Sequence, residues 1–290
     1  MAHTNPPTGL AEYRLPPVPD QHRGRSAEMI LRAAGEVESA SVVVFGAGRC
    51  EEIPLAALAQ RFRRVVLHDN QPELLEQAVA EAGLSISDRL KVYLAPLDLV
   101  GITDELVKTC RQAVAGALDL DRAIDGVAVA VSSAEPVTPE PRRYDLVVSS
   151  CVLSQLTFSL IQEVRQAIVD RFPQSQNRVQ ADPALTGAIE GLTRRCEAAF
   201  VDLLASSVTD EGRIYFSDTV QLCFVRRTEQ GDWSTPGTWR MTKTLRIDDY
   251  LDRRFTVDAR SRWNWVVNPP QALGEEGRLY DVQATILRLA

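Results

Sequence analysis

The chain is poor in histidine and lysine, and its cysteines are not clustered. Its three histidines come with no nucleophile-elbow sequence, so a Ser-His-Asp hydrolase is disfavoured. The five cysteines are odd in number and far apart, without a CxxC pair or a Cys/His cluster, which predicts reduced core thiols and no metal site. The three lysines lie in segments typical of ordinary strands, helices or loops, so a Schiff-base lysine has no candidate.

Long apolar runs and an excess of positive charge are also missing. No run approaches the roughly 20 apolar residues that span a bilayer, and the polar, Pro-containing N-terminus lacks the apolar core of a signal peptide. We therefore expect a cytoplasmic protein with no membrane association. The net charge of −7 argues against a nucleic-acid partner, because phosphate contacts need clustered Lys and Arg, although a local basic groove is not excluded.

Composition and length predict one folded unit preceded by an arm. With 290 residues and 45% hydrophobic content the chain can bury a full core, and we expect one domain over residues 26–290. Residues 1–25 are rich in proline and polar residues, with Tyr13, Leu15 and Val18 as isolated apolar anchors. They predict an extended arm that closes over the ligand cleft as a lid, with a disordered tail as the alternative.

A β-branched run that ends in two glycines is the most informative stretch of the sequence. Ser41–Phe45 predicts a buried parallel strand, and Gly46 and Gly48 predict a tight turn into a helix. The turn residues Phe45, Gly46, Ala47 and Gly48 are therefore candidate cofactor contacts. The alternative is that these glycines only make the bend, since two glycines alone are a weak signal.

The residues after the glycines favour one kind of nucleotide. Where a dinucleotide fingerprint has a third Gly or Ala, this chain has Glu51, followed by Glu52. We place both carboxylates in the first turn of the helix, where they would repel a diphosphate. A cationic nucleoside without phosphate would not be repelled, and S-adenosyl-L-methionine (SAM) is such a ligand.

An acidic residue ends each of the next two predicted strands. Asp69 follows the apolar run 64–68 about 20 residues beyond the glycines, a spacing that predicts hydrogen bonds to both ribose hydroxyls, with Asn70 beside it. A turn-forming Asp before Asn70 is the alternative. Asp98 ends the third strand, where it is a candidate acceptor for an adenine amino group. The alternative for Asp98 is a loop aspartate that caps a helix beginning near Thr103.

In the same segment, Leu97 and Leu99 flank Asp98 and are candidates to cover the adenine ring. Further along, a second apolar run over 144–153 holds Ser149 and Ser150 at its end. The order of these motifs resembles that of the class I SAM-dependent methyltransferases. The residues that carry the resemblance are Phe45–Gly48, the Asp69-Asn70-Gln71-Pro72 opening, Asp98, and Tyr144–Leu153, which together cover about residues 41–156.

The resemblance implies a fold and further contacts. It implies a Rossmann-like α/β fold: a seven-stranded mixed sheet that ends in an antiparallel hairpin, with helices on both faces and insertions after the third and fifth strands. It also implies that Ser149 and Ser150 contact the cofactor. The sequence departs from the family pattern at Val44, where an acid is common, and at Cys50, where a third glycine is common. The ammonium contact of the cofactor then falls to backbone carbonyls or to Glu51.

The second half of the chain predicts the remaining elements. Helical spacing marks 158–172 and a helix that begins at Asp182-Pro183, while 213–217 predicts the fifth strand. Alternation around Trp263 and Tyr280 predicts the closing hairpin, with the tryptophans in the core. We also expect weak strand character over 127–131, a short helix over 247–255, and a turn at residues 268–270.

The sequence therefore predicts an enzyme, a SAM-dependent methyltransferase. Its acceptor is a small molecule or a protein side chain in preference to a nucleic acid. The catalytic base is unassigned, with His22, Tyr13, Ser149, Ser150 and Asp218 as candidates. The alternatives are a SAM-binding or nucleoside-binding regulatory module without turnover and, third, a dehydrogenase. The sequence does not indicate an oligomeric state.

Overall fold

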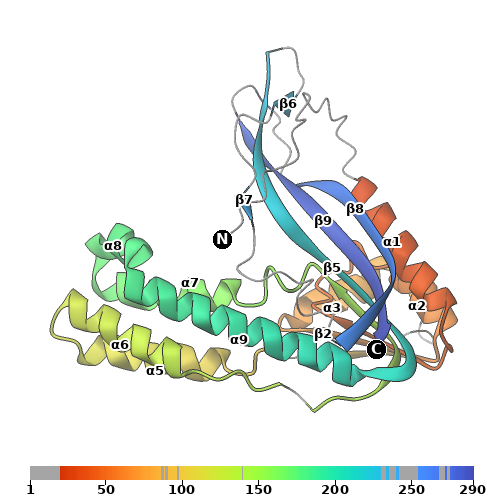
Figure 1. Ribbon diagram of the computed structural model, residues 1–290, viewed down its shortest axis with the longest axis horizontal. Helices are drawn as coiled ribbons and strands as arrows, with labels where there is room; N and C mark the ends of the chain where they lie inside the picture. Colours follow the sequence, from red (N-terminus) through yellow and green to blue (C-terminus); the bar gives the residue numbers. More distant parts are fainter. Residues whose placement is uncertain are drawn as a thin grey trace.

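A computed structural model describes residues 20–85, 88, 91–96, 98–138, 140–229, 233–234, 240–241, 254–267, 272 and 275–290. Its centre is one twisted sheet whose main path runs β3-β2-β1-β4-β5-β9-β8 (Figure 1). These strands are β1 (Ser41–Phe45), β2 (Arg64–Asp69), β3 (Val92–Pro96), β4 (Tyr144–Ser150), β5 (Val208–Arg227), β8 (Phe255–Val267) and β9 (Glu276–Leu289). Two short strands, β6 (Trp233–Ser234) and β7 (Arg240–Met241), pair with β5.

Strands β1 to β5 run parallel to one another, β9 runs the opposite way, and β8 beyond it returns to the direction of the first five. β1 lies between β2 and β4, with Val43 opposite both Val66 and Val147. Such β-branched runs are typical of parallel strands that are covered on both faces. β9 pairs antiparallel with β5 and with β8, which makes the closing hairpin. The predicted fold class, a mixed α/β sheet with a terminal antiparallel hairpin, is confirmed.

Helices cover both faces of the sheet. Helices α1 (Asp20–Gly35), α2 (Leu55–Arg61) and α3 (Pro72–Glu81) share one core with the sheet residues Val42, Val44 and Leu67. On the other face, α9 (Pro183–Ser207) packs Phe200 and Leu204 near its end against the opposite face of β1 and β4. The carboxyl ends of the parallel strands are therefore held at a fixed edge between two covered faces.

The remaining helices form a layer with a separate core. They are α5 (Thr103–Gly116), α6 (Leu120–Ser133), α7 (Phe158–Arg171), the 3-10 turn Pro173–Ser175 and α8 (Gln176–Ala181). Together with the first half of α9 they extend sideways from the sheet (Figure 1). None of the helices in the described ranges is long and apolar enough to cross a bilayer.

The prediction of strand character over 127–131 is wrong, because these residues lie inside α6. The buried side chains of this helix are Ala123, Ile124, Val127, Ala128 and Val131, which form one stripe at helical spacing. β-Branched residues favour strands only weakly, and packing of this stripe in the helical layer overrides that preference. The region after β3 is thus a pair of helices.

Several helices and strands also have boundaries that differ from the predicted ones. Helix α1 begins at Asp20, so residues 20–25 are helical and do not belong to an extended arm. The rest of the predicted arm, residues 1–19, lies outside the described residues, and its role as a lid stays a prediction. The fifth strand is longer than predicted, since β5 runs from Val208 to Arg227. Most of the predicted helix 247–255, and the turn 268–270, also lie outside the described residues.

Candidate functional site

The glycine turn after β1 is a run of left-handed residues. Gly46 has φ 63°, Gly48 has φ 48° and Cys50 has φ 53°. Glycine adopts this region freely, whereas a residue with a Cβ is strained in it by about 1–2 kcal/mol. Cys50 therefore occupies a position that suits glycine, which is where the resembled family commonly has one. The thiol is buried, and burial raises the pKa of Cys50 to about 12, so it is not a nucleophile.

The two carboxylates after the glycines are not in a helix, which corrects the prediction from the sequence. Helix α2 begins at Leu55 with Pro54 as its N-cap, and its first turn holds no acidic residue. Ile53 precedes a proline and is therefore biased away from helical geometry. Glu51 and Glu52 instead lie in an irregular loop, and their directions are set by side-chain partners.

Glu51 and Glu52 face different surroundings. Glu51 forms an ion pair with Arg23 and lies 3.8 Å from Arg49, with all three side chains substantially exposed. It is therefore occupied at the surface and is not the expected ammonium contact. Glu52 is partly buried beside Ser150, whose hydroxyl hydrogen-bonds to it. Burial raises the pKa of the Glu52 carboxyl, and the Ser150 hydrogen bond opposes that rise.

Asp69 joins the end of β2 to the glycine turn. The Gly48 N–H donates to Asp69 Oδ2 at 2.8 Å, and the Gln71 N–H donates to Asp69 Oδ1 at 3.0 Å. The Ala47 N–H also donates to the His68 carbonyl at 2.9 Å. A carboxylate offers about four acceptor positions, so two remain for ligand hydroxyls. The geometry accommodates both the turn-forming role and the ribose role.

Asp98 has a structural role in the loop after β3. It accepts hydrogen bonds from the N–H groups of Val100 at 3.0 Å and Thr103 at 2.9 Å. The Thr103 contact satisfies one of the unpaired N–H groups at the start of α5. This is the helix-capping alternative raised from the sequence, and Asp98 nevertheless also lines the pocket described next.

A pocket of about 180 Å³ lies at the carboxyl ends of β1, β2 and β3. It brings together five predicted cofactor residues: Gly46, Asp69, Asn70, Asp98 and Leu99. The sequence reasoning missed the opposite wall, which follows β4: Val152, Gln155, Leu156, Ser159, Leu160 and Glu163, with Thr103 beside it. Their position directly after the fourth strand was the available signal. Ligand pockets for small molecules commonly reach 300–1,000 Å³, so this one suits the nucleoside part of a larger ligand.

The other predicted contacts lie elsewhere. Phe45 points to the opposite face, where it stacks on His68 and lines a separate cavity of about 380 Å³. Ser149 is fully buried, and the Ser150 hydroxyl lies 3.2 Å from the Ser217 hydroxyl. Ala47 and Gly48 contribute through the backbone bonds of the turn. Leu97 lies outside the described residues, as does the candidate base Tyr13.

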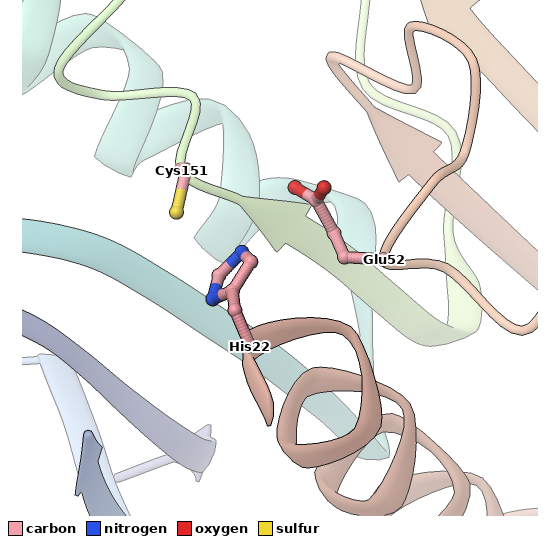
Figure 2. A group of neighbouring side chains, drawn as sticks. All are labelled: His22, Glu52 and Cys151. Carbon is pink, nitrogen blue, oxygen red and sulfur yellow. The ribbon is translucent and has the colours of Figure 1, made fainter. Parts of the chain in front are cut away.

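A second group of side chains involves the loop that follows the glycine turn. His22 from α1, Glu52 from the loop after β1 and Cys151 directly after β4 place one ligand atom each within 4.8 Å of one another. Figure 2 shows the three side chains converging. We call this group the His22 cluster. No local sequence pattern indicates this cluster, because its members are far apart along the chain.

The imidazole of His22 is fixed by two tryptophans of β8. It is 2% exposed, its ring stacks on Trp265 at 4.2 Å between centroids, and its Nδ1 accepts from the Trp263 Nε1–H at 2.9 Å. Burial, and secondarily the charge of Arg23, lowers the pKa of His22 to about 4. Trp263 is itself buried, as predicted for the core. His22 is therefore a neutral, oriented side chain at physiological pH.

The strand order identifies the fold. The sheet has a parallel block in the order β3-β2-β1-β4-β5, and β9 lies antiparallel between β5 and β8. This agrees with the mixed sheet and terminal antiparallel hairpin that the sequence resemblance implied. This is the class I SAM-dependent methyltransferase fold. The pocket lies where such doubly wound sheets bind ligands, outside the carboxyl ends of the strands at the point where the strand order reverses.

Comparisons with known proteins add structural neighbours of this fold. No family model and no curated protein matches the sequence. The N-methyltransferase NodS from Bradyrhizobium japonicum WM9, in complex with S-adenosyl-L-homocysteine, is 13% identical, with 92% of this chain and 86% of that chain covered and a TM-score of 0.41.

Two further solved structures are at a similar distance. A SAM-dependent methyltransferase from Leishmania major is 14% identical, with 93% of this chain and 73% of that chain covered and a TM-score of 0.42. A SAM-dependent methyltransferase from Aquifex aeolicus is 13% identical, with coverages of 92% and 94% and a TM-score of 0.39. At these identities the similarity concerns the arrangement of the chain and not what it binds.

Proposed function

We propose that the protein is a SAM-dependent methyltransferase whose acceptor is a small molecule or a protein side chain. The observation that carries the proposal is the position of Asp69. Its carboxylate is anchored to the glycine turn through the Gly48 N–H and also lines the pocket. An anchored carboxylate with two acceptor positions left suits a ribose diol.

The charges around the turn support a phosphate-free, cationic nucleoside. Glu51 and Glu52 follow the glycines, and Asp69 and Asp98 line the pocket, so a pyrophosphate would meet carboxylates on several sides. The N-terminal turn of α2, which a dinucleotide would use, starts after Glu52 and is capped by a proline without an N–H. This arrangement disfavours the dehydrogenase alternative.

SAM supplies the electrophilic methyl group when bound, and the chain's residues supply binding and alignment. Asp69 and Asn70 would hold the ribose, Leu99 would cover the base, and the glycine turn would let the ligand approach the backbone closely. Methyl transfer to a nucleophile is an in-line displacement, so orientation and exclusion of water are the main contributions of such a site.

Calorimetric titration with SAM, S-adenosylhomocysteine and NAD, each with wild type and Asp69→Ala, tests the proposal. A hydrogen bond to a charged group contributes about 1.5–3 kcal/mol, so Asp69→Ala should weaken binding of both sulfur nucleosides at least tenfold. Asp182→Ala is the matched control. Asp182 also accepts two backbone N–H bonds, at the start of α9 in the helical layer, and should affect stability without affecting affinity.

Turnover is measured separately from binding. Labelled SAM is incubated with the protein and size-fractionated cell extract, and transfer of label to a protein or small-molecule fraction is expected for wild type but not for Asp69→Ala. SAM binding without any transfer would favour the regulatory module. Tight binding of NAD without binding of SAM would contradict both the methyltransferase and the SAM-binding regulatory module.

A further inference from the structure

A second cavity, of about 380 Å³, is not used by the proposed function. It lies on the sheet face that α9 packs against, where Phe45, Val66 and Tyr144 form part of its wall. Among the described helices only α9 reaches it, through Leu203 and Ser207, because the helices that follow β3 extend sideways from the sheet (Figure 1). Small-molecule pockets commonly measure roughly 300–1,000 Å³, so this cavity is large enough for an organic ligand.

The end of this cavity at the amino edge of the sheet is positively charged. Arg64 is the first residue of β2 and Arg142 lies just before β4, and both line the cavity. Burial raises the pKa of Tyr144, and the positive charges of Arg64 and Arg142 oppose that rise, so both guanidinium groups lie near the same phenol. Glu140 is the acidic residue of the lining. Two arginines against one glutamate leave one excess positive charge, with His68 counted as neutral.

Arg64 has a buried donor without an acceptor. Its Nε atom is buried and has no hydrogen-bond partner within the described ranges. The guanidinium carbon lies 4.9 Å from the centre of the Tyr93 ring, a stacking contact that uses the face of the group and leaves its N–H edge open. Buried donors without an acceptor are uncommon. The N–H edge of Arg64 therefore points to an acceptor that a ligand supplies.

The remainder of the cavity wall is largely apolar. Phe45 stacks on His68 with 5.3 Å between the ring centres, and Val66 and Leu94 lie on the neighbouring strands. The side of the cavity at β3 is open, since Leu94 is 38% exposed and Tyr93 is 49% exposed. A ligand with an apolar body would remove this surface from water, which is favourable in proportion to the area covered. The lining therefore suits an anionic head joined to an apolar body.

The charged end lies far from the nucleoside pocket. Arg64 and Asp69 are the first and last residues of β2, so about 16 Å separate them at about 3.3 Å per residue. The two cavities share no lining residue. Neighbouring residues of a strand point to opposite faces, which is why Phe45 and His68 face this cavity although Gly46 and Asp69 line the other. A ligand held by Arg64 is therefore bound apart from the cofactor.

We propose that this cavity is a second ligand site, which binds an organic monocarboxylate with its head on Arg64 and Arg142 and its apolar body along Val66 and Leu94. The planar guanidinium fork matches the geometry of a carboxylate. A monocarboxylate neutralises the single excess charge of the lining, whereas a phosphate monoester, with a charge near −2, would leave negative charge uncompensated. The site does not depend on SAM and goes beyond the proposed function.

Calorimetry with ligands that share one body tests the head group. 4-Phenylbutanoate has the carboxylate, 4-phenylbutanamide is neutral, 4-phenylbutyl phosphate has a dianionic head, and octanoate provides a second apolar body. The proteins are wild type, Arg64→Met, Arg142→Met and the matched control Arg143→Met. Methionine keeps an apolar stem and removes the guanidinium. Arg143 adjoins Arg142 in sequence, but it pairs with Asp210 at 2.7 Å and does not line the cavity.

The expected affinities follow from the charge of each group. Wild type should bind both carboxylates at one site and the amide at least tenfold more weakly, because charge-assisted hydrogen bonds are lost. The phosphate ester should bind no more tightly than 4-phenylbutanoate. Arg64→Met should weaken the carboxylates about tenfold or more. Arg142→Met should weaken them about threefold, because Arg142 is exposed and solvent screens its charge. Arg143→Met should bind like wild type.

Urea unfolding distinguishes a ligand contact from a structural role of Arg64. Without ligand, Arg64→Met should unfold at a urea concentration close to that of wild type, because its Nε–H makes no hydrogen bond that the substitution could remove. Saturating 4-phenylbutanoate should raise the midpoint of wild type but not that of Arg64→Met. Asp69→Ala should bind 4-phenylbutanoate like wild type, so failure of this site and failure of the cofactor site are distinguishable.

The opposite results would overturn the proposal. Absence of saturable binding of both carboxylates to folded wild type would show that the cavity is not a carboxylate site. Equal affinities for the carboxylate and the amide would mean that only the apolar wall binds, and tenfold tighter binding of the phosphate ester would assign a dianion instead. A loss in Arg143→Met as large as that in Arg64→Met would reduce the effect to the overall surface charge.

Discussion

Because His22 is buried in its neutral form, the free energy of unfolding should depend on pH in the acidic range. Its pKa is lowered to about 4 in the folded protein, against about 6.5 in the unfolded chain. Between these values the unfolded chain binds a proton that the folded protein does not, so stability falls as pH falls from about 6.5 toward 4. The contribution of His22 to stability is fully present above the unfolded pKa.

The size of the effect follows from the two pKa values. One pKa unit corresponds to 1.36 kcal/mol. At pH 5, His22 is protonated in nearly all unfolded chains but in few folded ones. The free energy of unfolding of wild type should therefore fall by about 2 kcal/mol between pH 7 and pH 5 because of this residue. Glu52 acts with the opposite sign. Its raised pKa adds stability at low pH that is lost as pH rises above its unfolded value.

The two contributions are separated by comparing wild type with His22→Phe. Urea unfolding at pH 7, 6 and 5 gives the free energy of unfolding of each protein, and the difference between them removes the shared contribution of Glu52 and other groups. His22→Phe is destabilising at pH 7, because it leaves the Trp263 N–H without its acceptor. This deficit should shrink by about 2 kcal/mol at pH 5. Parallel curves over this range would refute the buried neutral imidazole.

Three further predictions concern the glycine turn and its partner. Gly46→Ala should lower the free energy of unfolding, measured by urea denaturation, by about 1–3 kcal/mol, because Gly46 has φ 63° and the new Cβ would meet Val152. The double variant with Val152→Ala should recover part of this loss. Cys50→Gly should be more stable than Cys50→Ala by about 1 kcal/mol in thermal melts, since only glycine relieves the strain at φ 53°, and equal melting temperatures would contradict this. Asp69→Asn should bind SAM more weakly than wild type and should have a lower melting temperature, because the Gly48 N–H loses a charged acceptor. An unchanged melting temperature would show that this hydrogen bond does not contribute to stability.

The sequence determined the central sheet and the nucleoside side of the site. Short β-branched runs that end in glycine or aspartate predict parallel strands with their functional residues at one edge, because the pattern is local and the topology brings strand ends together. Asp69, Asn70 and Asp98 were placed in this way, and the structure brings them to one pocket. The terminal hairpin around Trp263 and Tyr280 was predicted by alternation for the same local reason.

Only the tertiary structure decided where the neighbouring side chains point. The strand character predicted over 127–131 gave way to helix α6, because its apolar stripe packs in a helical layer that no local pattern describes. Glu51 and Glu52 are adjacent in sequence and indistinguishable there, but a surface arginine pairs with the first and the second turns inward. The His22 cluster joins positions 22, 52 and 151, and a tryptophan from the last hairpin sets the tautomer of its histidine. Such contacts between distant segments depend on how the helices and strands pack, and the spacing of residues in the sequence does not indicate them.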